Sequence, residues 1–188
     1  MLKLLMSAVA LLATSLAAAQ SATYTVEPGH TFVYFEVVHS ATSTTRGRFD
    51  DIQGSITLNP TDKTGHARIV IDSASVSSGV LPFDEHLRNA DFLNVPLFPK
   101  ATFVGDGFSF EGDKVTALSG ALTLLGKTQA VTLRASRFNC YDNPRSKRHI
   151  CGGDFETTLQ RSNFGMSFGL PGIPDDVRLL IQIEAIRQ

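Results

Sequence analysis

The sequence has no excess of charge of either sign. Its 188 residues include 17 lysines and arginines and 18 aspartates and glutamates, which gives a formal net charge of −1. A nucleic-acid-binding domain would instead carry a clustered basic surface. We therefore expect no nucleic acid among the partners of this chain.

Long apolar segments are also missing, except near the N-terminus. Met1-Leu2-Lys3 supplies one positive charge, Leu4–Leu16 is apolar, and Ala17-Ala18-Ala19 matches the small-residue pattern of a cleavage site. The apolar segment is shorter than the roughly 20 residues that span a bilayer as a helix. We predict a cleaved signal peptide over residues 1–19, one domain over residues 20–188 and export to the periplasm.

Cysteine is scarce, because only Cys140 and Cys151 are present. In an exported protein an even pair predicts a disulfide. It would close a loop of about a dozen residues and contribute roughly 3 kcal/mol by restricting the unfolded chain. The alternative is a reactive cysteine paired with His149. It requires a reduced thiol, which export disfavours.

Tryptophan is absent, whereas phenylalanine occurs 13 times. Phenylalanine brings apolar area without a polar group. Such a composition favours a protein that lines an apolar cavity in addition to packing a core.

Strand patterns follow one another along the mature chain. Short β-branched and aromatic segments are separated by Gly, Pro, Asn and Asp, which predicts an all-β sandwich or barrel of about eight strands. The expected strands are residues 24–26, 31–39, 52–58, 67–71, 101–110, 114–124, 129–138, 155–159 and 177–185. Phe83 and Leu87 recur at helical spacing, so one short helix is predicted near 81–90 as a lid or plug. An eight-stranded barrel can be filled or can hold one small ligand, and strand periodicity does not separate these cases.

Several segments, taken together in their order and spacing, resemble the YceI-like family of exported lipid-binding proteins. They are Tyr24-Thr25-Val26, Gly29-His30-Thr31, Phe35–His39, Gly47-Arg48-Phe49, Asp84–Leu87, Asp91-Phe92-Leu93, Phe98–Phe103, Gly120–Thr128 and Arg161–Met166. The resemblance implies an eight-stranded antiparallel lipocalin-like β-barrel with an apolar tunnel. Its ligand would be a polyisoprenoid, an isoprenoid quinone or a similar long amphiphile. The chain departs from the family pattern at Thr31 and Asn163, where Ser and Asp are common.

The matching segments also supply the residues expected at the ligand. The tunnel is expected to be lined by Phe35, Val37, Phe83, Leu87, Phe92, Phe103, Phe164 and Phe168. Arg161, with His39 or His86, is expected to hold the head group, because the forked guanidinium suits oxyanions.

We expect lipid binding without catalysis, and two alternative functions remain open. Gly165–Gly169 fits the G-x-S-x-G motif of hydrolases, which would make Ser167 the nucleophile of a lipid esterase. That motif requires a helix after the serine, and the following Leu170–Pro174 cannot form one. The other alternative is a stress or interaction module whose barrel core is filled.

No metal or cofactor is predicted, because the five histidines show neither H-x-H nor H-E-x-x-H spacing. Residues 145–149 include Arg145, Lys147 and Arg148 and are interpreted as a solvated basic loop. Transient contact of this loop with anionic lipid head groups is the alternative. The sequence predicts no oligomeric state.

Overall fold

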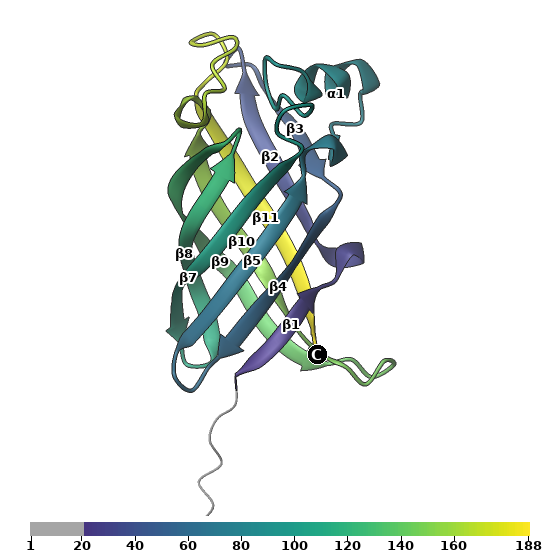
Figure 1. Cartoon of the computed structure of the whole chain (residues 1–188), viewed down its shortest axis with the longest axis vertical. Helices are drawn as coiled ribbons and strands as arrows, with labels where there is room; N and C mark the ends of the chain where they lie inside the picture. The colour runs from purple at the N-terminus through teal and green to yellow at the C-terminus, as the bar shows by residue number, and fades with distance from the viewer. Residues whose placement is uncertain (1–20) are drawn as a thin grey trace, which may run out of the picture.

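Eleven strand segments hydrogen-bond into one antiparallel sheet in the computed structural model, which describes residues 21–188 (Figure 1). The strands are β1 (Ala22–Val26), β2 (Phe32–His39), β3 (Ser43–Phe49), β4 (Ile52–Asn59), β5 (Thr64–Asp72), β6 (Val76–Ser77), β7 (Lys100–Glu111), β8 (Lys114–Leu124), β9 (Lys127–Asp142), β10 (His149–Gln160) and β11 (Asp176–Arg187). One α-helix, α1 (Leu81–Arg88), and three 3-10 turns, η1 (Pro28–His30), η2 (Ser73–Ser75) and η3 (Arg161–Phe164), complete the fold. The predicted signal peptide, residues 1–19, lies outside the described residues.

The eleven segments form a closed barrel of eight strands, as predicted. Eleven segments make eight strands of the barrel because three of these strands are each interrupted once. β2 continues the strand begun by β1, β4 continues β3, and β6 continues β5. The sheet closes because β1 pairs with one half of β11 and β2 pairs with the other half. Pro28 lies at the first break, where its missing N–H cannot serve the ladder.

Side chains alternate between the interior and the solvent along the wall, as expected for strands. On β4, Ile52 and Leu58 are buried, whereas Gln53 and Ser55 are exposed. The predicted helix is confirmed over Leu81–Arg88 and lies across one end of the barrel (Figure 1). None of the helices within residues 21–188 has the length and apolar character needed to cross a bilayer.

Two strands were not predicted from the sequence: the two-residue β6 and the longer β3. The residues of β3, Ser43–Phe49, are mostly polar and show no apolar alternation. They form a strand because they pair in continuous register with β2, from Val33 opposite Phe49 to His39 opposite Ser43. Cross-strand pairing therefore determines this element, and local propensity does not.

The predicted disulfide joins the neighbouring strands β9 and β10. Cys140 lies directly opposite Cys151, with 4.1 Å between their Cα atoms. Both strands extend beyond this pair, so the predicted loop 145–149 is shorter than expected and His149 begins β10. The tip of this hairpin lies at the end of the barrel that carries the C-terminus, opposite α1 (Figure 1).

Candidate ligand-binding cavity

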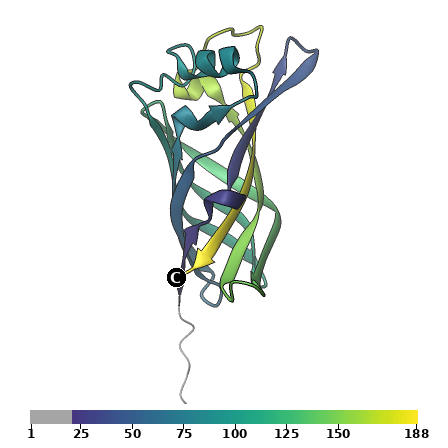
Figure 2. The same ribbon diagram turned by 90° about the vertical axis from the view of Figure 1, so that its right-hand side faces the viewer.

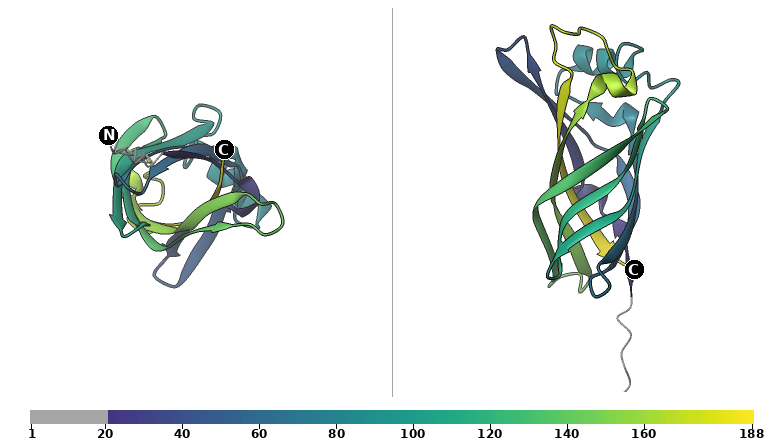
Figure 3. Two further views of the ribbon diagram at one scale, coloured as in Figure 1. Left: turned by 90° about the horizontal axis from the view of Figure 1, so that it is seen from below. Right: turned by 90° about the vertical axis from the view of Figure 1, so that its left-hand side faces the viewer.

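The interior of the barrel contains two adjoining apolar chambers. A mouth chamber of about 350 Å³ lies under α1, and a deep chamber of about 110 Å³ lies further along the barrel. Four residues line both chambers and form a waist between them: Val33, Ile71, Leu122 and Leu179. Figure 3 shows the barrel along its axis, with the strands forming a ring around this interior.

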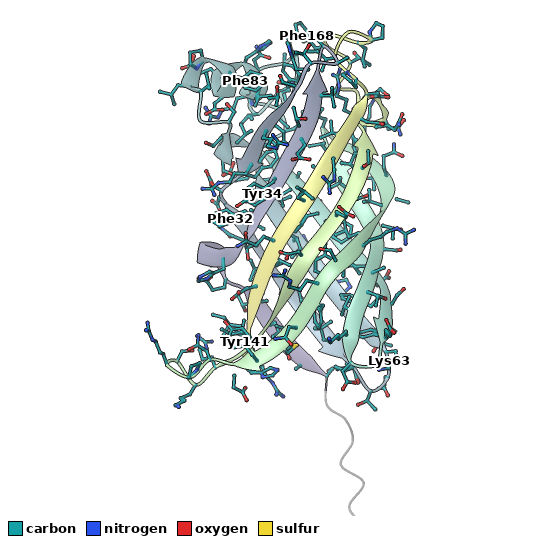
Figure 4. All side chains as sticks on the ribbon, turned by 180° about the vertical axis from the view of Figure 1, so that it is seen from behind. Phe32, Tyr34, Lys63, Phe83, Tyr141 and Phe168 are labelled. Carbon is teal, nitrogen blue, oxygen red and sulfur yellow. A yellow bond between two sulfur atoms is a disulfide. The ribbon has the colours of Figure 1, made fainter. Side chains whose placement is uncertain are left out.

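The mouth chamber is built from segments that are distant in the sequence. α1 contributes Phe83, His86 and Leu87, and the segment from η3 to β11 contributes Phe164 and Phe168. Figure 2 shows α1 and η3 at the same end of the barrel, and Figure 4 shows Phe83 and Phe168 there. Because the helix and this rim segment meet across the end, they narrow the opening of the cavity.

All eight residues expected at the tunnel lie on its wall. Phe103 lines the deep chamber, and the other seven, Phe35, Val37, Phe83, Leu87, Phe92, Phe164 and Phe168, line the mouth chamber. Their contact with a ligand stays a prediction. Most of the deep chamber was not predicted. Its wall includes Tyr24, Ile52, Ile56, Leu58, Ala67, Ile69, Phe108, Val115, Leu118, Val131, Leu133, Phe138 and Phe155. Several of these residues are the apolar members of strands in which apolar and polar residues alternate. This alternation was the signal in the sequence that they face the interior.

The wall of the deep chamber is almost entirely apolar. The Thr31 hydroxyl, which is 1% exposed, donates to the Glu184 carbonyl at 3.2 Å. Burial raises the pKa of the Tyr24 hydroxyl, so this group stays neutral. Within residues 21–188, no buried side-chain nitrogen or oxygen lacks a hydrogen-bond partner. The deep chamber therefore suits an apolar group and offers no charged partner to a polar one.

The guanidinium of Arg161, 3% exposed, is largely engaged by the rim of the cavity. Nε donates to the Pro174 carbonyl at 2.9 Å, and Nη2 donates to that of Ile173 at 3.0 Å. Nη1 donates to the carbonyls of Met166 at 3.1 Å and Phe168 at 2.8 Å. Four of the five guanidinium N–H bonds thus hold the loop after η3. The head-group role of Arg161 stays a prediction, and one guanidinium N–H remains that could bind a head group.

Hydrogen bonds between Ser162 and Asp175 join the two ends of this rim segment. Ser162 donates its backbone N–H to Asp175 at 2.8 Å and its hydroxyl to the same carboxylate at 2.6 Å. These bonds lower the pKa of Asp175, and burial lowers the pKa of Arg161. The two ends of residues 163–174 are consequently held next to each other.

The two histidines expected at the head group both line the mouth chamber. His39 ends β2 there. The His86 Nε2 lies 3.0 Å from Asp91 Oδ2, and its ring centroid lies 4.9 Å from that of Phe92 and 5.3 Å from that of Phe168. The Phe92 and Phe168 rings lie 5.4 Å apart. This cluster of three rings joins the segment around α1 to the rim loop.

The G-x-S-x-G motif does not have the geometry of a nucleophile elbow. Ser167 lies in an irregular loop, preceded by η3 and followed by turns. Gly165 and Gly169 have φ values of +91° and +74°, in the left-handed region that favours glycine. The backbone of the rim loop therefore explains both glycines without a nucleophile.

Within residues 21–188, one group of side chains has the composition of a metal site. Cys140, His149 and Cys151 place their ligand atoms within 4.8 Å of one another. Both sulfurs are joined in the disulfide and cannot coordinate an ion in this state. This group lies at the opposite end of the barrel from the mouth.

Comparison with known protein families gives one match that covers most of the chain. The model of the YceI-like domain matches residues 24–185. A UPF0312 protein of Pseudomonas aeruginosa is 34% identical over 163 residues, which cover 86% of this chain and 84% of the relative. The protein YceI of Salmonella newport is 32% identical over 163 residues, with the same coverage of each chain.

Solved structures share the fold. BcnA of Burkholderia cenocepacia aligns with a TM-score of 0.69 at 22% identity and covers 85% of this chain and 99% of its own. The YCEI protein of Campylobacter jejuni gives a TM-score of 0.71 at 23% identity, over 80% of this chain and 90% of its own. A polyisoprenoid binding domain from Saccharophagus degradans gives 0.64 at 15% identity, over 88% and 98%.

Proposed function

Because the chain belongs to the YceI-like family, we propose that it binds a long apolar lipid of the polyisoprenoid kind in its barrel and catalyses no reaction. The observation that carries this proposal is the apolar cavity that begins under α1 and continues past the waist into the deep chamber. The polyisoprenoid binding domain from Saccharophagus degradans has the same fold. The two chambers argue against a filled core, because side chains do not occupy this space.

Burial of the apolar chain would supply most of the affinity. Each CH₂-sized group removed from water contributes about 0.8 kcal/mol before the cost of ordering the ligand. The tail would occupy the deep chamber, whose wall is almost entirely apolar. The polar end would stay at the mouth, close to His39, His86 and the remaining N–H of Arg161.

The proposed compartment is the periplasm. The disulfide between Cys140 and Cys151 fits an oxidising compartment. Cleavage of residues 1–19 as a signal peptide belongs to the same proposal. In the binding role, Ser167 contributes only to the rim loop.

Native mass spectrometry of the mature protein, purified from its own secretory compartment and then extracted with organic solvent, tests the binding role. We expect a stoichiometric adduct with the mass of an isoprenoid or isoprenoid quinone, released into the organic phase. A bare polypeptide that also fails to take up added polyprenol would contradict the proposal and favour the interaction module. Ester hydrolysis lost on Ser167→Ala would instead favour the esterase.

We propose further that the mouth, and not the basic hairpin, faces a lipid surface during ligand exchange. Seven large apolar residues of the described chain are exposed, and five belong to segments at the mouth: Val38, Val80, Leu81, Leu97 and Phe168. Leu81 and Leu97 are 76% and 70% exposed. The basic loop 145–149 lies at the other end of the barrel, so its contact with a membrane would not bring the cavity to the lipid (Figure 1).

The double substitution of Leu81 and Leu97 by serine tests this contact. We expect transfer of a fluorescent polyprenol from phosphatidylcholine vesicles to slow about 10-fold or more, because two apolar side chains no longer enter the interface. Affinity for polyprenol delivered in detergent should stay the same. The control is Val104→Ser, which removes an apolar side chain that is 38% exposed on β7. Equal transfer rates in the double variant and the control would contradict the proposed orientation.

A further inference from the structure

The end of the barrel opposite the mouth holds a second cluster of four side chains, of which Cys151 also lines the deep chamber. In the register of β9 and β10, Cys140 lies opposite Cys151 and Asp142 lies opposite His149. Residues two apart on a strand share a face, so all four side chains project from the same face of this hairpin. Figure 4 shows the disulfide close to Tyr141, far from Phe83 and Phe168.

The histidine of this cluster is oriented toward the sulfur of Cys151. His149 Nδ1 lies 2.8 Å from Asp142 Oδ1, and Nε2 lies 3.8 Å from Cys151 Sγ. With Nδ1–H donated to the carboxylate, Nε2 keeps its lone pair and presents it to the sulfur. A carboxylate on the far nitrogen is the arrangement that orients imidazole ligands in metal sites. A disulfide by itself requires neither the imidazole nor the carboxylate.

One sulfur–nitrogen distance already matches that of a metal site, and the two sulfurs, now bonded, would separate on reduction. A tetrahedral zinc ion, with Zn–S of about 2.3 Å and Zn–N of about 2.0–2.1 Å, holds sulfur and nitrogen ligands about 3.6 Å apart. The separation of 3.8 Å between Cys151 Sγ and His149 Nε2 is close to this value. The side chains of His149 and Asp142 are 33% and 82% exposed, which leaves a path for an ion from solvent.

We propose that Cys140, Cys151 and His149 form a binding site for a zinc-class cation that becomes available when the disulfide is reduced. Two thiolates and one imidazole are the donors that such soft or borderline ions prefer, and three protein ligands leave a fourth position for water. Asp142 acts as a positioning residue, because it contacts His149 and not the ion.

The redox step balances with a dithiol reductant of the thioredoxin class, which has to be supplied to the oxidising compartment in which the disulfide otherwise persists. The dithiol supplies two electrons and two protons, the S–S bond between Cys140 and Cys151 breaks, and the reductant becomes a disulfide. The two resulting thiols release their protons when Zn²⁺ binds as a bis-thiolate. Oxidation of the pair reverses this, since sulfurs joined to each other no longer bind the ion. The same hairpin thus has an oxidised, metal-free state and a reduced, metal-binding state.

Zinc titration of the mature protein in its two redox states tests the site. The chain is reduced anaerobically with a phosphine, and Zn²⁺ affinity is measured by competition with a chromophoric chelator; Cd²⁺ is added to a second sample to detect thiolate charge-transfer absorption. We expect about one ion per reduced chain and none per oxidised chain. Asp142→Asn should lower the affinity about 10- to 100-fold, and His149→Ala should lower it further.

The control is His66→Ala, which removes a histidine from β5, on another strand of the wall. Its affinity in the reduced state should equal that of the wild type. Circular dichroism of each reduced sample establishes that the barrel is intact. The proposal is overturned if the reduced wild type binds no ion, if it unfolds on reduction, if the oxidised chain binds equally well, or if His149→Ala leaves the affinity unchanged.

Discussion

Replacing Leu122 by tryptophan is expected to abolish tight binding of long polyprenols while sparing short ones. Leu122 lies at the waist, where it lines both chambers. The larger side chain would obstruct the passage and keep the tail out of the deep chamber. A single five-carbon isoprene unit excluded in this way forfeits about 4 kcal/mol, at ~0.8 kcal/mol per CH₂-sized group, which corresponds to a loss of affinity of roughly 1000-fold.

Fluorescence displacement with a series of polyprenols of increasing length measures this effect. In the wild type, affinity should rise with chain length until both chambers are filled. In Leu122→Trp it should stop rising at the length that fills the mouth chamber. Val104→Trp is the matched control, because it adds the same side chain on the outer face of the wall. An identical dependence on chain length in both variants would show that the tail does not pass the waist.

Replacing Arg161 by methionine is expected to produce the largest loss of stability among single substitutions at the rim. The change removes four hydrogen bonds to the carbonyls of Pro174, Met166, Phe168 and Ile173. Hydrogen bonds to charged groups contribute about 1.5–3 kcal/mol each, and rim carbonyls can recover part of this from water. We therefore expect the free energy of unfolding to fall by about 3 kcal/mol or more.

Urea unfolding of Arg161→Met and of Arg134→Met gives a matched comparison, because Arg134 is an exposed arginine on β9. The control should change the free energy of unfolding by less than about 0.5 kcal/mol. Hydrogen exchange of residues 165–174 should increase in Arg161→Met alone. Ligand retention should decrease as well, since Phe164 and Phe168 line the mouth. Similar urea midpoints for the two variants would mean that the rim does not depend on Arg161.

The contrast between β3 and β4 shows how far local patterns predict this fold. β4 was expected because apolar and polar residues alternate from Ile52 to Leu58, and a period of two is the local signature of a half-buried strand. β3 lacks this signal, and its residues become a strand only through pairing with β2. The helix at Leu81–Arg88 was expected from the spacing of Phe83 and Leu87.

The tunnel was predicted in part, from the family resemblance and not from local sequence patterns. Eight of its wall residues were expected from resemblance to the family, and all eight line the cavity, seven at the mouth and Phe103 in the deep chamber. The deep chamber could not be inferred, because inward-facing residues follow the same alternation in a filled barrel as in a hollow one. The volume left between facing walls depends on the registers of all eight strands together.

Sequence by itself determined the strands with clear alternation, the helix and the disulfide, since each depends on spacing along the chain or on the presence of one cysteine pair. Tertiary structure decided the roles of the polar groups. Arg161 was expected at a ligand head group, yet four of its donors bind carbonyls brought near by the rim loop. His149 and Asp142 meet beside the disulfide only because the β9–β10 register places them opposite each other. Hydrogen bonds require atoms to lie within about 3 Å in space, and only the folded chain establishes which atoms do.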